Sequence, residues 1–407
     1  MKKKKILYLY QYFRHPGEPG GTRAYWIARK MVESGYDVTV VTQKNSFNKE
    51  NKNAKFVERV NLDGIQVLYI KNAYFNGFSY ARRLYSFLRF MVLSSWFSLR
   101  EKEIDLVVAT STPLTIAVPA LLIKKLKKIP MVFEVRDLWP EVPIQMGAIN
   151  NRLLIQFLRW FEKITYKNAV HVNTLSPGMQ EGVCKYIPIE KTSMIPNMSK
   201  IDKFWPREKD SKLQNELKLS DQSFKIIHFG AMGVANGLDN FIDAASFALK
   251  QSITDIEFIL VGNGRMKPHF LKRKENEKLV NLHIFDRMPM DLISKLVNIC
   301  DASYVGFLPK PILETNSANK FFDSLSAGKP ILLNFGGWMQ ELVEKNECGI
   351  RVDASVGTDL LRKIIYLKDN PKRKEKMGKA ARDLAEKKFD KTILSSQFLQ
   401  IITNIKD

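Results

Sequence analysis

One pattern, in which a strand is followed by a glycine-bearing loop, a helix and a second strand, restricts the fold of this chain more than any other feature. It first occurs where a β-type run at 5–10 precedes a loop with consecutive glycines. Apolar residues at helical spacing then predict an amphipathic helix at 22–34, and Gly35 is a typical stop signal before a strand at 38–42. This order of elements favours an α/β domain.

The same order recurs far downstream. A strand at 225–229 precedes a glycine-bearing loop at 230–237, a helix at 238–249 and a strand at 256–261. Further apolar runs, typical of strands that are covered on both faces, lie at 106–109, 131–135, 169–173, 302–307 and 330–333. The sequence therefore predicts two doubly wound α/β domains with parallel sheets.

The length and the charge pattern predict where these domains divide. A chain of 407 residues is long for one core and suits two domains of about 200 residues each. The stretch at 200–223 is charge-dense and poor in apolar residues, so we predict a linker there. We expect an N-terminal domain at 1–200 and a C-terminal domain at 201–390, facing a central cleft. The amphipathic segment at 391–407 needs a partner surface, and we expect it to pack back on the first domain.

The net charge limits the kinds of partner. Lys plus Arg number 64 against 42 Asp plus Glu, which gives a formal charge of +22. Such a surface attracts nucleic acid, anionic lipid headgroups or phosphorylated substrates. The basic residues are spread along the chain without an RRM, KH or zinc-finger signature, so a nucleic-acid-binding protein is a remote alternative and we expect no nucleic acid partner.

Cysteine usage and the first residues bear on metal sites and location. The three cysteines and five histidines show no metal-ligand spacing, so we expect no metal site. Free thiols are typical of a reducing compartment. The lysines at 2–5 resemble the start of a signal peptide, but the run at 6–12 is too short and too polar for its apolar region. We therefore expect a cytoplasmic protein.

The tract at 319–330 has the pattern of a ligand-binding edge. It predicts a loop, a short helix with one carboxylate, a stop at Gly328 and then a buried strand. Doubly wound sheets bind nucleotides in the loops at the carboxyl ends of their strands. A phosphate-facing loop with a carboxylate one turn inside its helix suggests a nucleotide sugar.

Several motifs occur in a fixed order along nearly the whole chain. They are Pro19-Gly20-Gly21, Gly35-Tyr36-Asp37-Val38, Arg136-Asp137-Leu138-Trp139-Pro140-Glu141, Ser176-Pro177-Gly178, the glycine loops at 230–238 and 261–264, and the 319–330 tract. With this set the chain resembles a family 4 glycosyltransferase of the two-Rossmann (GT-B) class. The resemblance is strongest to the bacterial surface-polysaccharide branch that includes fucosamine transferases.

The resemblance implies a retaining glycosyltransferase that uses a UDP-sugar. The donor sugar would be an N-acetylated deoxyhexosamine such as L-FucNAc, and the acceptor a polyprenyl-diphosphate-linked sugar in O-antigen or capsule synthesis. No cofactor or metal is implied, which agrees with the absence of a DxD-type carboxylate pair from the sequence. A UDP-sugar epimerase or a soluble glycosyltransferase of the same fold is the alternative.

The resemblance assigns donor-binding roles within the 319–330 tract. A carboxylate can accept hydrogen bonds from both ribose hydroxyls at once, so Asp323 is the candidate ribose anchor. Lys320 is the candidate group for the donor diphosphate, together with the backbone amides from Asn316 to Asn319. The alternative is a solvated helix in which Asp323 is only a charge partner.

Two glycine motifs are further donor-site candidates. Gly20 and Gly21 at a helix start let backbone amides approach an anion or an acceptor, although an ordinary glycine turn has the same pattern. Gly262 and Gly264 follow a predicted strand, but the third glycine of a dinucleotide fingerprint is absent because position 267 is Lys267. This leaves room for a single nucleotide.

The chain departs from the family pattern of two glutamates separated by seven residues. Counting back from Asp323, the first position falls on Thr315, and Glu314 lies one residue earlier. A loop can absorb one residue, so Glu314 remains a candidate catalytic residue that reaches the donor sugar.

The loop at 230–237 departs from the pattern as well. Many relatives have an arginine and a lysine where this chain has Ala231 and Asn236. The cations that could replace them are Lys320, Arg265 and Lys267.

Asp137 is the candidate acid/base or acceptor-orienting residue of the first domain. It follows the predicted strand at 131–135, in a loop that Trp139 and Pro140 restrain. An ionised carboxylate there could take the acceptor hydroxyl proton as the sugar transfers. The alternative is an ion pair with Arg136.

Two apolar segments of the first half suggest a membrane surface. Residues 82–100 are apolar and aromatic with flanking arginines, but Arg89 interrupts them and they are too short to span a bilayer comfortably. They predict either a buried helix or an interfacial one, and 152–167 offers a second such surface. With the basic cluster at 124–128, they would hold the enzyme at the inner face of the cell membrane, as a peripheral protein near a lipid-linked acceptor.

Overall fold

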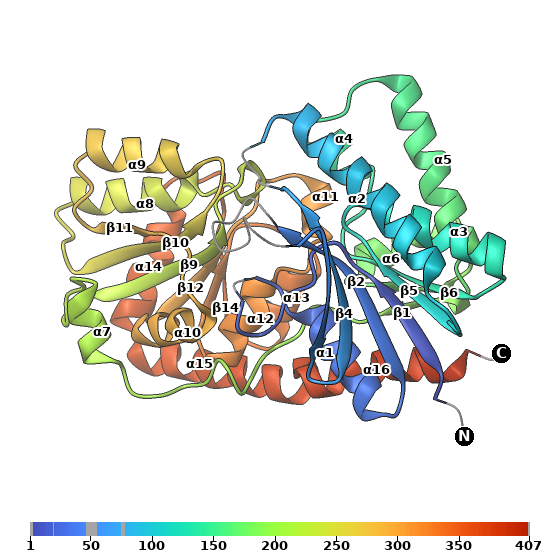
Figure 1. Ribbon diagram of the computed structural model, residues 1–407. Coiled ribbons are helices and arrows are strands. Elements are labelled where there is room, and N and C mark those ends of the chain that lie inside the picture. Colours follow the sequence, from blue (N-terminus) through green and yellow to red (C-terminus); the bar gives the residue numbers. More distant parts are fainter. Residues whose placement is uncertain (1–2, 19, 46–54, 75–77, 406–407) are drawn as a thin grey trace. The chain divides into compact units, whose positions relative to one another are not determined.

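The computed structural model describes residues 3–18, 20–45, 55–74 and 78–405 (Figure 1). These residues form two compact units, each with its own sheet. The first unit contains nearly all described residues up to Pro196 and those from Thr392 onward, and the second contains Asn197–Lys391. Both units are Rossmann-like α/β domains, which confirms the fold class that the repeated strand–loop–helix pattern predicts.

The sheet of the first unit has eight strands in the order β3-β4-β2-β1-β5-β6-β7-β8. Every neighbouring pair is parallel except β3 and β4. The strands are β1 Lys5–Leu9, β2 Asp37–Asn45, β3 Val57–Leu62, β4 Ile65–Asn72, β5 Leu106–Thr110, β6 Met131–Val135, β7 His171–Thr174 and β8 Thr192–Met194. The central strands are buried along their length, as expected for strands covered on both faces.

Helices cover both faces of this sheet. Figure 1 shows α2, α3 and α5 on one face and α1 with the C-terminal α16 on the other. The helices are α1 Arg23–Glu33, α2 Tyr80–Arg100, α3 Ala117–Lys127, α4 Glu141–Gln145, α5 Arg152–Asn168, α6 Pro177–Cys184 and α16 Lys391–Asn404. From Thr392 onward α16 belongs to the first unit, although it follows the second in sequence.

The second unit has a fully parallel sheet in the order β11-β10-β9-β12-β13-β14. Its strands are β9 Phe224–Ala231, β10 Ile256–Asn263, β11 Leu282–Phe285, β12 Ala302–Val305, β13 Ile331–Leu333 and β14 Gly349–Arg351. Its helices are α7 Ser211–Glu216, α8 Asp239–Lys250, α9 Lys267–Asn276, α10 Met290–Ile299, α11 Pro311–Glu314, α12 Asn319–Ser326, α13 Trp338–Lys345, α14 Asp359–Asp369 and α15 Pro371–Leu384.

The charge-dense stretch at 200–223 is part of the second unit rather than a free linker. Phe204, Leu213 and Leu219 are buried in the core beside β9 and β10, and α7 lies within the stretch. A few well-spaced apolar side chains are therefore enough to anchor a segment whose composition is otherwise that of a linker.

No helix in the described residues is long and apolar enough to cross a membrane. Helix α2, which contains the predicted membrane-surface segment at 82–100, packs one face on the sheet through Phe90 and leaves other apolar side chains exposed.

Candidate functional site

The carboxyl ends of β9, β10 and β12 carry the loops of the candidate donor site in the second unit. β9 ends with Gly230 and Ala231, which are both exposed. The Lys320 side chain, from the first turn of α12, extends toward this strand end, because a Cβ at Gly230 would lie 3.3 Å from Lys320 Cε. The structure therefore brings the predicted diphosphate ligand to the edge where α/β sheets bind nucleotides.

Lys320 contacts a buried histidine that the sequence analysis did not identify. Its Nζ lies 3.3 Å from His228 Nε2, and His228 Nδ1 lies 3.1 Å from the carbonyl oxygen of Tyr304. Nδ1 must donate to that carbonyl, so Nε2 is the acceptor for the Lys320 ammonium. Burial, with Lys320 nearby, holds the His228 pKa well below its usual value, and burial lowers the pKa of Lys320 to about 7.

Gly262 and Gly264 have a packing role that accounts for both residues. Gly262 has φ +150°, and a Cβ there would lie 1.8 Å from the Gly230 carbonyl oxygen. A Cβ at Gly264 would lie 2.3 Å from the Met232 carbonyl oxygen. Because the loops after β9 and β10 touch backbone to backbone, glycine is required whether or not a nucleotide binds there.

Asp323 is almost completely buried and pairs with a lysine from outside the tract. Lys200 Nζ lies 2.7 Å from Asp323 Oδ1, and the two side chains are 5% and 10% exposed. Burial raises the pKa of Asp323, and Lys200 counteracts this. Asp323 lies one helical turn from Lys320. If it binds the ribose as predicted, it does so with a carboxylate that is already paired with Lys200.

The loop before α12 is held by the residues that begin the second unit. Asn197 donates from its backbone nitrogen to Ser317 Oγ (3.1 Å) and from Nδ2 to the Ser317 carbonyl oxygen. Ser199 Oγ donates to the Phe322 carbonyl oxygen at 3.0 Å. Of the amides predicted for the diphosphate, that of Asn316 already donates to the Leu313 carbonyl oxygen. Asn319 is the first residue of α12, and its side chain is half-buried.

Glu314 and Thr315 differ in their surroundings. The Thr315 hydroxyl donates to the Ile312 carbonyl oxygen at 2.8 Å. The Glu314 carboxylate borders the glycine turn before α13, where a Cβ at Gly336 would lie 3.0 Å from Glu314 Oε1. The Glu314 side chain therefore lies beside the turn that precedes α13, whereas the Thr315 hydroxyl is used within its own turn.

The cations predicted to replace the missing pair are not equivalent. Lys267 Nζ lies 2.6 Å from Asp286 Oδ1, whereas Arg265 is exposed and makes no side-chain interaction with the described residues. Asn236 is buried, and its Oδ1 accepts a hydrogen bond from the Gly233 nitrogen (3.3 Å), so it shapes the loop after β9. Lys320 is the predicted cation that the structure places against the exposed end of β9.

Asp137 of the first unit is bonded to a threonine. Its Oδ2 accepts a hydrogen bond from Thr112 Oγ1 at 2.7 Å, while Arg136 Nη1 donates to the Tyr10 hydroxyl at 2.8 Å. The alternative of an ion pair between Asp137 and Arg136 is therefore replaced by two separate hydrogen bonds. Burial raises the pKa of Asp137, and the Thr112 hydrogen bond and then the Arg136 charge lower it.

A buried network at the same strand ends was missed by the sequence analysis. Arg23 donates from Nε to Glu134 Oε1 at 2.9 Å, and Asn173 Nδ2 and Thr110 Oγ1 donate to the same carboxylate at 3.2 Å. Glu134 lies inside the apolar run that predicts β6, so its only sequence signal is a charged residue in a buried strand. The network connects the start of α1 to β5, β6 and β7.

Gly20 and Gly21 lie directly before Thr22, the N-cap residue of α1, and Pro19 lies outside the described residues. Gly20 is exposed and has φ +134°, a conformation that favours glycine. Both residues belong to the first unit, so they are not among the groups that the second unit brings together around Lys320.

In the described part of the chain, no group of three or more His, Cys, Asp or Glu side chains is placed to hold a metal ion. The polar side chains at the end of β9 are instead a lysine and an uncharged histidine, and the lysine suits an anionic ligand.

Comparisons with known proteins identify the class of both units. The family described as "Glycosyl transferase 4-like domain" matches residues 20–198, and the one described as "Glycosyl transferases group 1" matches residues 209–384. Together these matches account for most of the chain.

Two curated relatives and one solved structure illustrate the similarity. The Escherichia coli K12 protein provisionally named colanic acid biosynthesis glycosyl transferase WcaI is 26% identical over 223 residues, covering 52% of this chain and 54% of that protein. The α-galactosylglucosyldiacylglycerol synthase of Streptococcus pneumoniae is 27% identical over 124 residues, 30% of each chain. The chain thus spans about half the length of the first relative and less than a third of the second.

The solved structure of HepE from Anabaena, in complex with UDP and glucose, has a TM-score of 0.73 to this chain. It is 19% identical, and the alignment covers 99% of this chain and all of the other. At that identity the likeness establishes the fold. The two family matches make this chain a glycosyltransferase in which a glycosyl transferase 4-like domain precedes a glycosyl transferases group 1 domain, and the structural likeness gives it the GT-B fold.

Proposed function

We propose that this enzyme transfers a sugar from a UDP-sugar to a polyprenyl-diphosphate-linked acceptor, with retention of anomeric configuration, during the assembly of a surface polysaccharide such as O-antigen or capsule. The position of Lys320 carries the donor part of this proposal. A lysine desolvated enough to lower its pKa to about 7 lies against the exposed end of β9. The diphosphate of a bound donor would provide a negatively charged partner for this ammonium.

Each proposed role belongs to one side chain. Lys320 stabilises the UDP leaving group as the glycosidic bond to the donor breaks, and no metal ion takes part. Asp323 accepts hydrogen bonds from the ribose hydroxyls, and Glu314 contacts the donor sugar. Asp137, which Thr112 holds in place, accepts the acceptor hydroxyl proton directly or through the donor phosphate.

Exposed apolar side chains support a lipid-linked acceptor. On α2, Leu84, Leu88, Val92 and Trp96 recur every fourth residue with exposed fractions of 42–60%, and Tyr85 lies beside them. On α5, Leu153, Leu154, Phe157 and Trp160 are 44–77% exposed. We call these nine side chains the apolar helix patch.

Basic residues accompany the apolar helix patch. The exposed arginines Arg82 and Arg100 lie near the two ends of α2, and α5 exposes Arg152, Lys163 and Lys167. Both helices contact α3, which ends in the basic cluster at 124–128. Aromatic and aliphatic side chains with neighbouring cations are typical of helices that lie in the interface of an anionic membrane. The enzyme would then be a peripheral protein at the cytoplasmic face of the membrane.

The relatives agree with this proposal. One is named for colanic acid biosynthesis, another for synthesis of a glycosyl diacylglycerol, and the neighbouring structure contains UDP and glucose. An N-acetylated deoxyhexosamine such as L-FucNAc is the donor sugar that the sequence resemblance implies, so UDP-L-FucNAc is the first donor to test.

The decisive experiment is a donor screen followed by a transfer assay. UDP-sugars should raise the melting temperature of the protein, whereas GDP- and ADP-sugars should not. The stabilising donor is then incubated with undecaprenyl-diphosphate-linked N-acetylglucosamine in anionic vesicles, and the product is analysed by mass spectrometry and NMR. UDP release without glycosylated lipid would contradict the proposed acceptor, and a product with inverted configuration would contradict retention.

A further inference from the structure

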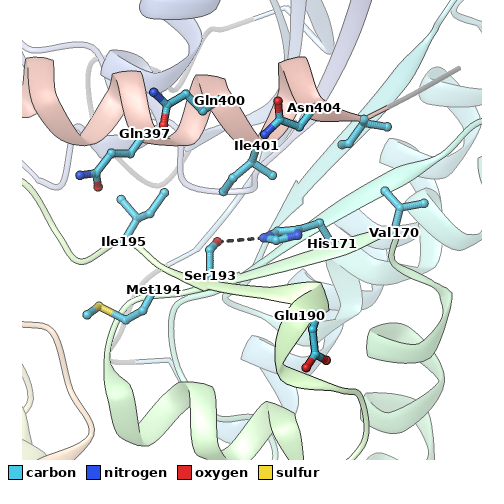
Figure 2. A pocket seen from close by; sticks show the side chains of 11 residues that line it. Val170, His171, Glu190, Ser193, Met194, Ile195, Gln397, Gln400, Ile401 and Asn404 are labelled. Atoms are coloured by element: carbon cyan, nitrogen blue, oxygen red, sulfur yellow. Dashed lines mark hydrogen bonds between the residues drawn. The ribbon is translucent and has the colours of Figure 1, made fainter.

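A groove in the first unit lies between α16 and the strands β7 and β8 (Figure 2). Its volume is about 690 Å³, within the range of small-molecule sites. None of its lining residues has been given a role in donor binding or proton transfer above. β8 is the edge strand of the described sheet, and α16 forms the wall of the groove that faces β7 and β8.

Side-chain amides dominate the α16 wall. Gln397, Gln400 and Asn404 line the groove at helical spacing, so they share one face of the helix, and Figure 2 shows them on the ribbon above the two strands. Within the described residues, none of these amides has a side-chain hydrogen bond to another protein group. Each amide offers a carbonyl acceptor and an NH₂ donor, and a sugar hydroxyl needs that combination.

The opposite wall is fixed by a hydrogen-bonded chain. His171 Nε2 lies 3.0 Å from Ser193 Oγ, and Ser193 Oγ donates to Asn173 Oδ1 at 2.9 Å. Because the serine proton is used by Asn173, His171 donates from Nε2, and its Nδ1 is left as an acceptor. Asn173 in turn donates to the buried Glu134 carboxylate at 3.2 Å. The polar wall is therefore preorganised, which reduces the entropy cost of binding.

The charge of the groove contrasts with that of the protein. The chain carries +22, yet the described residues that line the groove include no lysine or arginine, and Glu190 is the carboxylate among them. His171 is neutral near pH 7 because burial lowers its pKa. A phosphate group would meet no cation among these described lining residues and would be repelled by Glu190. Val170, Ile195 and Ile401 add aliphatic surface that suits the C–H faces of a sugar ring.

We infer that the groove between α16 and β8 binds an uncharged saccharide, at a site separate from the donor and acid/base residues. The amides of α16 and the acceptor nitrogen of His171 bond its hydroxyls, and the aliphatic side chains cover its ring. This binding requires neither a nucleotide nor an acceptor lipid, so it can be measured independently of sugar transfer.

The test uses the full chain with ¹³C-labelled isoleucine methyl groups and no donor. Maltotriose and triacetylchitotriose serve as uncharged probes, and glucose 6-phosphate as the anionic comparison. At least one uncharged probe should shift the Ile195 and Ile401 methyl signals in a saturable manner, and glucose 6-phosphate should shift them less. Absence of a shift with both uncharged probes, or tighter binding of glucose 6-phosphate, would overturn the inference.

Variants locate the binding within the groove. The double variant Gln400→Leu with Asn404→Leu should bind the probe at least tenfold more weakly. Thr403→Leu is the matched control, because Thr403 is exposed on the same helix but does not line the groove. Unchanged methyl signals elsewhere in the protein report that each variant is folded. Equal affinity of the double variant and the control would assign the binding to another surface and refute the inference.

Discussion

Lys200 Nζ lies 2.7 Å from Asp323 Oδ1, in an ion pair that joins the beginning of the second unit to the second turn of α12. This ion pair and the hydrogen bonds of Asn197 and Ser199 hold the 197–200 segment against the 317–323 tract. The residue predicted to bind ribose therefore already has a buried charge partner. Its contributions to stability and to donor binding can be separated by substitution.

Lys200→Met should lower the free energy of unfolding by about 3–5 kcal/mol, since it leaves the Asp323 carboxylate buried without a partner. The double variant Lys200→Met with Asp323→Leu removes both charges and should recover most of that loss. Urea denaturation of the wild type, both single variants and the double variant measures the coupling. Additive losses would show that the pair contributes no coupling energy.

Asp323→Asn should weaken UDP binding about ten- to a hundredfold, because an amide can accept only one of the two ribose hydrogen bonds without charge assistance. Asp301→Asn is the matched control. Asp301 is another largely buried carboxylate of the second unit, paired with Lys374 at 2.9 Å and outside the donor tract. Calorimetric titration with UDP measures both affinities, and equal affinities would remove Asp323 from the ribose site.

Donor binding should weaken as the pH rises above about 7. The Lys320 pKa is about 7 in the free protein, so at higher pH a diphosphate must bind together with a proton, which costs up to tenfold in affinity per pH unit. The effect on stability has the opposite sign. Between pH 7 and the usual lysine pKa of 10.5 the unfolded chain binds more protons, so deprotonation of Lys320 makes the free protein more stable as the pH rises.

Two lysine variants test this pH dependence. Lys320→Met should bind UDP weakly and with little dependence on pH. Lys329→Met should keep the wild-type dependence, because Lys329 is half-buried in the same tract but its Nζ donates to the Asn298 carbonyl oxygen. Titrations with UDP between pH 6 and 9 give the slopes. A wild-type slope in Lys320→Met would assign the proton to another group.

Asp137→Asn should reduce turnover by about 10²–10⁴-fold with little effect on UDP affinity, since it removes the proposed proton acceptor and preserves the shape of the side chain. Thr112→Val removes the hydrogen bond that lowers the Asp137 pKa. The acidic limb of its rate profile should therefore move to higher pH, with activity retained above that limb. Rates measured from pH 4 to 9 check both outcomes, and an unshifted limb would exclude Asp137 as the titrating group.

Strand prediction succeeded where burial is periodic or continuous. The run at 131–135 coincides with β6, and the run at 256–261 lies within β10. The hairpin of β3 and β4 was missed, although Asp63-Gly64 between alternating apolar and polar residues is a strong hairpin signal. The short edge strands β8 and β14 carry little signal, because three residues are too few to show a period.

The candidate site could be predicted only where its residues are close in sequence. The 319–330 tract shows its helix, its lysine and its glycine stop directly. His228 contacts Lys320 from 92 residues away, and Lys200 reaches Asp323 from 123 residues away, so no local pattern indicates either contact. Likewise, the sequence shows that Gly262 and Gly264 are glycines, but only the fold shows that the neighbouring backbone occupies the space of their side chains.

Membrane association should depend on the apolar helix patch, whereas Arg89, predicted as part of the interfacial surface, should matter for folding. Arg89 Nη1 donates to the Lys71 carbonyl oxygen at 2.5 Å and to Asn72 Oδ1 at 3.1 Å, so Arg89→Glu should lower the melting temperature. Leu88→Glu with Trp96→Glu should instead leave it nearly unchanged and abolish sedimentation with anionic vesicles, because both side chains are exposed. Co-sedimentation of this double variant at the wild-type level would favour a soluble transferase.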